Sequence, residues 1–163
     1  MAKVMILGVG DLGASKGHDV VIRTFALGSC VALIAYDLKA KVAGMVHVAL
    51  PESRINTTRA RLKPGTFADT GVDALLAAMA PLRGRSGKSG LVVKLVGGAN
   101  VMDKKNFFAI GQRNIKALHG ELEKIRIFPM AEDVGGSFSR TVSIQVATGR
   151  VYISSPGRDI WEL

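Results

Sequence analysis

The chain has 163 residues, of which 48% are apolar, and its 22 Lys and Arg against 13 Asp and Glu give a net charge of +9 and a pI near 10.1. This length predicts one domain, residues 1–163, and the apolar content excludes a disordered basic tail. The single cysteine excludes an internal disulfide and a cysteine-rich metal cage, and an aromatic content of 6% is too low for a nucleic-acid stacking platform.

The sequence predicts neither a signal peptide nor a membrane span. The apolar stretch after Lys3 is interrupted at Asp11, too early for a signal-peptide core, and no run approaches the roughly 20 apolar residues of a membrane span. We therefore expect a cytoplasmic protein without membrane insertion.

The first third of the chain is predicted to form strands. Short apolar or β-branched runs indicate strands at Val4–Leu7, Val20–Phe25, Val31–Tyr36 and Val42–Leu50.

Two glycine-rich motifs follow strands, and both are interpreted as turns. Gly8–Gly13 matches G-x-G-x-x-G, but Ala14–Asp19 is too short for the helix of a dinucleotide site, and no carboxylate follows at the required distance. Gly97–Asn100 lacks the Lys-Ser/Thr ending of a phosphate-binding loop. We expect no organic cofactor and no metal.

The middle of the chain is predicted to hold a basic loop and a helix. Glu52–Thr66 has no apolar periodicity, and its Arg and Lys residues have no acid between them, so an exposed loop is expected. A helix follows, capped by Thr66 or Asp69, with apolar residues on one face: Val72, Leu75, Leu76, Met79 and Leu82. A second basic loop carries Arg83, Arg85 and Lys88.

The rest of the chain predicts one more helix and several strands. The helix runs over Ile115–Ile125, with Gly120 as a mild defect, and the strands are Leu91–Val96, Ile127–Met130, Thr141–Val146 and Val151–Ser154. Glu132 and Asp133 would face opposite sides of an extended chain, as helix caps or surface charges. Strands arriving in hairpins with only two helices favour an α/β layered sandwich, a mostly antiparallel or mixed β core flanked by two helices.

The single thiol is the strongest candidate for chemistry. Cys30 begins a predicted strand after Gly28 and Ser29, whose small side chains allow close approach and whose amides could support an oxyanion. If the hairpin closes symmetrically over Asp37–Ala40, Cys30 lies opposite His47, at thiol-to-imidazole distance. A slip of one residue would separate them, and the alternative is a structural thiol beside a core histidine.

Thr24 could complete this group. It lies near the end of the strand that leads into the Gly28 turn, where its hydroxyl could orient the imidazole of His47. A threonine in a strand is also simply a good strand former, so the position alone does not decide between the two.

Several segments of the chain, in order, resemble the CheD family of chemoreceptor glutamine deamidases. They include LGSC at residues 27–30, HVALP at residues 47–51, KPGTFADTGVDALL, GGAN, IGQRNI and AEDVGG. The resemblance implies a deamidase domain with an α/β sandwich fold that converts particular receptor glutamines to glutamate and ammonia. It implies Cys30 as nucleophile, His47 as its base and Thr24 as the residue that orients His47.

The resemblance also implies partners, and two other functions remain open. The implied partners are the cytoplasmic helices of chemoreceptors and a CheC-type phosphatase, although the docking segment here has Val101-Met102-Asp103, with Phe107 and Phe108 later, where the family has a Met-Phe pair. The charge alone would suit a nucleic-acid-binding module, and a catalytically silent regulator that binds the phosphatase is the third reading. We expect no nucleic-acid partner.

Overall fold

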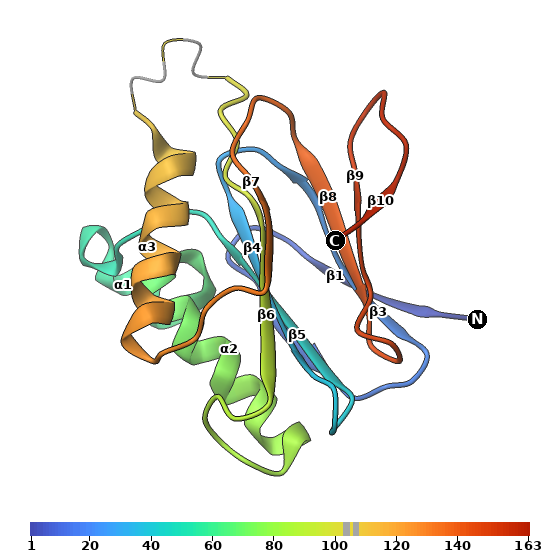
Figure 1. Cartoon of the computed structure of the whole chain (residues 1–163). Coiled ribbons are helices and arrows are strands. Elements are labelled where there is room, and N and C mark those ends of the chain that lie inside the picture. Colours follow the sequence, from blue (N-terminus) through green and yellow to red (C-terminus); the bar gives the residue numbers. More distant parts are fainter. Residues whose placement is uncertain (103–104, 106–107) are drawn as a thin grey trace.

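The computed structural model of the chain describes residues 1–102, 105 and 108–163, so Asp103 and Phe107 of the docking segment lie outside the described residues. Two five-stranded sheets pack face to face, and the helices cover the outer face of one of them, which gives the helix, sheet and sheet layers seen in Figure 1. The predicted α/β layered sandwich with a mixed β core is confirmed, and both long helices lie on the same side of it.

The first sheet has the order β1-β3-β8-β9-β10. Its strands are β1 (Lys3–Leu7), β3 (Val20–Leu27), β8 (Arg140–Gln145), β9 (Val151–Ser154) and β10 (Trp161–Glu162). The β1 and β3 strands are parallel and the other neighbours are antiparallel. In Figure 1, no helix formed by the described residues covers the outer face of this sheet.

The second sheet has the order β2-β5-β4-β6-β7 and lies between the first sheet and the helices. Its strands are β2 (Leu12–Ser15), β5 (Val42–Val48), β4 (Val31–Asp37), β6 (Leu91–Gly97) and β7 (Ala131–Val134). Every residue of β4 and β5 is buried, because both faces of these strands are covered.

The described residues form three α-helices: α1 (Thr57–Leu62), α2 (Ala68–Arg83) and α3 (Ile110–Lys124). Of these, α2 and α3 pack on the second sheet. One apolar core fills the space between α2, α3 and the second sheet, and another fills the space between the two sheets. Within the described part of the chain, no helix has the length and apolar character needed to cross a membrane.

Four elements differ from the prediction, and for the strands the difference comes from pairing with a segment distant in sequence. Strand β2, which contains the last glycine of the G-x-G-x-x-G match, forms by pairing with β5. The basic loop contains α1, whose first turn is capped by the Asn56 side chain, which accepts from the Arg59 amide. The strand predicted at Ile127–Met130 forms instead at β7, because Phe128 and Met130 are exposed and Pro129 has no amide to donate. Strand β10 was not predicted.

The acidic residues also behave differently from expectation. Neither Thr66 nor Asp69 caps α2: the N-cap residue is Phe67, which makes no side-chain cap, and the Asp69 carboxylate accepts hydrogen bonds from Ser53. Asp133 is no surface charge: it accepts from Arg140 at 2.8 Å and from the Trp161 indole at 2.7 Å. Glu132 pairs with His119 instead, so the two acids do face opposite sides of β7.

Candidate active site

Cys30 lies in the turn between β3 and β4, where it is partly exposed and packs at the margin of the core between the sheets. Two hydrogen bonds fix this turn against the end of β6: the Ala99 amide donates to the Gly28 carbonyl at 2.7 Å, and the Gly98 amide donates to the Cys30 carbonyl at 2.8 Å. Gly97 has a φ of 119°, and a Cβ there would collide with the Cys30 carbonyl oxygen. The backbone that carries the thiol is therefore held against the end of β6.

The predicted pairing of Cys30 with His47 is wrong by two residues. In the ladder between β4 and β5, His47 lies opposite Ala32. Because side chains alternate along a strand, a two-residue shift keeps the same face, whereas a one-residue slip would not. His47 faces the core between the sheets, like Met45 on the same strand, and Cys30 packs against that same core. The thiol and the imidazole are thus diagonal neighbours on one side of the sheet.

The shift originates in the hairpin turn. Asp37 pairs with Val42, so the turn spans residues 38–41 and not the predicted Asp37–Ala40. The Asp37 carboxylate accepts from the Ala40 amide at 2.9 Å, and Lys41 has a φ of 55°. Asp37 also bonds the buried Arg83 at the end of α2, a contact that no local pattern signals.

Thr24 and His47 connect the two sheets. The Thr24 hydroxyl on β3 lies 2.7 Å from Nδ1 of His47 on β5, and both residues are buried. The same hydroxyl lies 2.8 Å from the Leu7 carbonyl oxygen, to which it donates. A carbonyl oxygen can only accept, and a hydroxyl has one proton, so Nδ1 of His47 must donate to Thr24.

This arrangement fixes the tautomer of the neutral imidazole. With the proton on Nδ1, Nε2 of His47 carries the lone pair. Nε2 is buried and has no hydrogen-bond partner among the described residues. A free ring nitrogen of this kind is what a general base requires.

Burial keeps both groups neutral in the resting protein. Burial raises the pKa of the Cys30 thiol above its usual value. Burial lowers the pKa of His47 to about 4; the negative charge of Asp11 opposes that change and the positive charge of Lys63 adds to it. Desolvation disfavours the charged form of each group, so neutral thiol and neutral imidazole coexist near pH 7.

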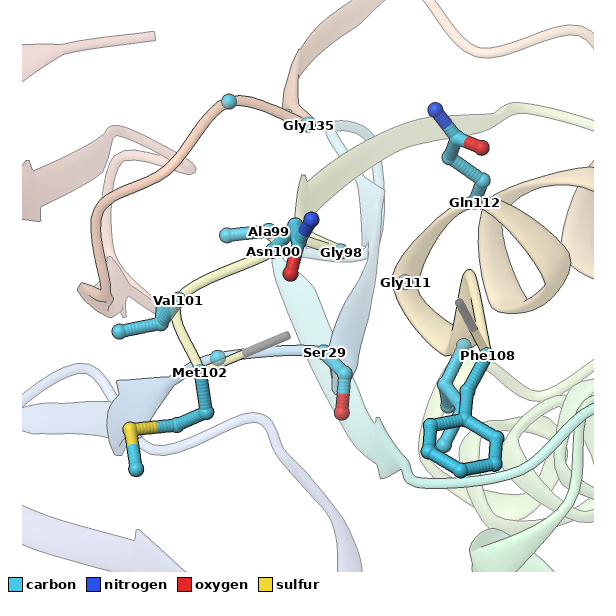
Figure 2. A pocket seen from close by; sticks show the side chains of 13 residues that line it. Ser29, Gly98, Ala99, Asn100, Val101, Met102, Phe108, Gly111, Gln112 and Gly135 are labelled. Carbon is cyan, nitrogen blue, oxygen red and sulfur yellow. The ribbon is translucent and has the colours of Figure 1, made fainter. Parts of the chain in front are cut away.

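A pocket of about 230 Å³ adjoins the Cys30 turn. Gly28 and Ser29 form one part of its wall, and Figure 2 shows Ser29, the Gly98–Asn100 segment and Gly111 of α3 around it. Exposed apolar side chains stand on its rim: Val101, Met102 and Phe108. Cys30 and His47 do not line this pocket. Cys30 is the residue that follows Ser29, and His47 lies on the neighbouring strand, β5.

Sequence analysis missed Asn114, which holds the turn from the helix side. Its side-chain amide donates to the Ser29 carbonyl and to the Ala49 carbonyl, each at 2.9 Å, and the residue is fully buried. The signal was present in the helix pattern, because Asn114, Leu118 and Leu122 are four residues apart and all three are buried. A polar residue in a buried apolar row needs a specific partner.

The site contains no evident metal-binding group. Within residues 1–102, 105 and 108–163, no three His, Cys, Asp or Glu side chains gather as a metal ion would require. The chemistry that the described side chains can perform is nucleophilic attack by a thiol assisted by a neutral histidine.

Comparison with known proteins points to one family. A family model described as CheD chemotactic sensory transduction matches residues 49–155, a range that begins after His47. The probable chemoreceptor glutamine deamidase CheD of Syntrophotalea carbinolica is 50% identical over 98% of each chain, and the probable chemoreceptor glutamine deamidase CheD 1 of Syntrophus aciditrophicus is 38% identical over 98% of each. Among solved structures, the hypothetical protein YfiH of Bacillus licheniformis matches at a TM-score of 0.39 and 10% identity, covering 68% of this chain and 46% of that one, too little to relate the folds.

Proposed function

Because the chain belongs to the CheD family of chemoreceptor glutamine deamidases, we propose that it hydrolyses particular glutamine side chains of bacterial chemoreceptors to glutamate and ammonia, using Cys30 and His47. The observation that carries the mechanism is the hydrogen bond from His47 to Thr24, which leaves Nε2 as an unpaired base on the same side of the sheet as the single cysteine. The supporting family evidence comes from relatives aligned over nearly the whole chain.

The first half-reaction is the attack of the thiol on the carboxamide. An amide is a poor electrophile, so it requires a strong nucleophile, and the thiolate supplies one. Since thiol and imidazole both rest neutral, the proton of Cys30 passes to Nε2 of His47 as the sulfur bonds to the amide carbon. The imidazolium then gives that proton to the departing nitrogen, so ammonia leaves and a thioester remains on Cys30.

The second half-reaction releases glutamate. Nε2 of His47 takes a proton from water, and the resulting hydroxide attacks the thioester carbonyl. The carbon–sulfur bond breaks, and the proton on the imidazolium returns to the sulfur. Thr24 stays bonded to Nδ1 throughout and keeps Nε2 directed toward the reacting atoms.

The tetrahedral intermediates need hydrogen-bond donors for their oxyanion. The turn at residues 28–30 offers its backbone amides, and Gly28 and Ser29 keep side chains out of the way. The amides of Ser29 and Cys30 donate to no acceptor among the described residues, so they are free to bind the oxyanion.

The same proposal covers the setting of the reaction. The substrate is the cytoplasmic helical region of a chemoreceptor, the enzyme acts in the cytoplasm, and a CheC-type phosphatase restrains it. The pocket beside Ser29 and its apolar rim suit the docking of a helical protein surface next to the thiol. A catalytically silent regulator would dock in the same way but would not hydrolyse glutamine. The following experiment distinguishes the regulator from the enzyme.

The test is mass spectrometry of a chemoreceptor signalling fragment after incubation with the protein. Each glutamine converted to glutamate adds about 1 Da, because the NH₂ group leaves as ammonia and a heavier OH group from water replaces it. Cys30→Ala and His47→Ala should abolish the mass shift while the folded state persists, and Thr24→Val should reduce the rate by about 10-fold through loss of imidazole orientation. Full conversion by Cys30→Ala, or no conversion by the wild type on any receptor fragment, would reject the proposal.

A further inference from the structure

We propose that Asn114 is a positioning residue that directs the Cys30 amide into the oxyanion site, an inference that rests on the proposed deamidation. Asn114 belongs to α3, on the helix side of the second sheet, and does not contact the thiol directly. Its action is on the peptide bond between Ser29 and Cys30.

The two hydrogen bonds settle the orientation of the Asn114 side chain. Both partners, the Ser29 and Ala49 carbonyl oxygens, can only accept, so the nitrogen of the side chain faces them and donates both of its hydrogens. One side chain thereby joins the turn before β4 to the end of β5, the two strands that carry Cys30 and His47.

The bond to Ser29 fixes the direction of the next amide. The described residues contain no cis peptide bond, and in a trans peptide the carbonyl and the following N–H point to opposite sides. The Ser29 carbonyl points toward Asn114 on α3, so the Cys30 N–H points away from α3. Thr24 and His47 lie on that same side.

The Cys30 amide is available for a substrate. It donates to no acceptor among the described residues, whereas the Cys30 and Gly28 carbonyls are both bonded to the end of β6. A donor beside the nucleophile, on the side of its base and without a partner, has the placement of an oxyanion-hole group.

If Asn114 served packing alone, its burial would lower the stability of the fold. It is fully buried, and its Oδ1 has no hydrogen-bond partner among the described residues. A leucine at this place in the row with Leu118 and Leu122 would remove the unpaired Oδ1, but it would also leave the Ser29 and Ala49 carbonyls without this donor. The two donated hydrogen bonds are therefore what the asparagine provides and an apolar residue could not.

The experiment uses Asn114→Asp, which keeps the shape but replaces the donor with an acceptor, and Asn114→Leu, which removes the amide without burying a charge. Leu122→Ala is the matched control, because it weakens the same helix in the same core without touching the turn. Each protein is measured by ¹⁵N relaxation of the Cys30 amide, by kcat and KM on a receptor fragment, and by the rate at which iodoacetamide modifies Cys30.

We expect both Asn114 variants to mobilise the Cys30 amide and to lower kcat by about 100-fold, with KM and the alkylation rate close to those of the wild type. Leu122→Ala should lower the melting temperature and leave kcat near wild type. A Cys30 amide as rigid as in the wild type would overturn the proposal, and so would a parallel loss of alkylation, which indicates collapse of the turn. If the wild type deamidates no receptor, the proposed function fails, while the relaxation measurement still decides whether Asn114 positions the amide.

Discussion

At the scale of single residues, the site depends on which nitrogen of His47 carries the proton. Thr24 donates its only proton to the Leu7 carbonyl, so Nδ1 must be the donor and Nε2 the free base. Burial then holds the pKa of His47 at about 4 and raises the pKa of Cys30. The pair therefore rests neutral and does not form a preformed thiolate and imidazolium.

The neutral pair predicts how the reactivity of the thiol depends on pH. Iodoacetamide reacts with the thiolate, so the alkylation rate of the free protein should keep rising through about pH 8.5, the ordinary thiol value, without a plateau near neutrality. Because Cys30 is the only cysteine, incorporation of label measures this residue alone, and Cys30→Ala provides the blank. A plateau beginning between about pH 5 and 7 would show an ion pair in the resting enzyme and contradict the prediction.

At the scale of secondary-structure elements, the close approach of α3 to the end of β6 shapes the pocket. Gly111, in the first turn of α3, lies against the carbonyls of Gly98 and Ala99, and a Cβ there would overlap both. Gly120 lies further along the same helix, and a Cβ there would meet nothing within 4 Å. The two glycines share a helix and differ only in what surrounds them.

These glycines form a matched pair for a prediction. Gly120→Ala should stabilise the fold by about 0.5–1 kcal/mol through the higher helix propensity of alanine, with activity unchanged. Gly111→Ala should destabilise it by roughly 1–3 kcal/mol, because α3 must move away from the 97–100 turn, and should also lower activity. Urea denaturation and deamidation rates measure both effects. Equal stability of the two variants would show that α3 does not pack against this turn.

At the scale of the whole molecule, the net charge of +9 is distributed unevenly. Arg83 and Arg85 of the second basic loop both bond Asp37 inside the fold, so this loop contributes less to the outer field than its sequence indicates. Arg59 and Arg61 of α1 are exposed. Helix α1 ends at Leu62, and the next residue, Lys63, pairs with Asp11 at 2.9 Å; the Asp11 carbonyl accepts a hydrogen bond from the His47 amide. The exposed basic charge thus lies beside the candidate site.

This placement predicts electrostatic steering toward an acidic protein surface. Raising the salt concentration should lower kcat/KM for a whole receptor fragment by about tenfold or more and should hardly affect a short neutral glutamine peptide. Arg59→Gln with Arg61→Gln should remove most of the salt dependence. Equal sensitivity of both substrates would contradict steering, and tight binding of DNA with a steep salt slope would instead favour the nucleic-acid alternative.

The sequence alone determined which residues could do chemistry and the class of fold. One cysteine, a strand histidine and a threonine near a strand end are local facts, and alternating or helical periodicity depends only on neighbouring residues. For the same reason, α2, β4 and β6 lie close to their predicted ranges. The resemblance to the CheD family could likewise be identified from short segments.

How those residues meet depends on contacts between distant segments of the chain. The hairpin of β4 and β5 turns at residues 38–41, where Asp37 bonds Arg83 of α2, and β2 and β7 form because a strand partner lies beside them. The tautomer of His47 follows from a carbonyl of β1, and the direction of the Cys30 amide follows from Asn114 on α3. A sequence pattern reports the preferences of nearby residues, whereas these features are set by hydrogen bonds between segments that only folding brings together.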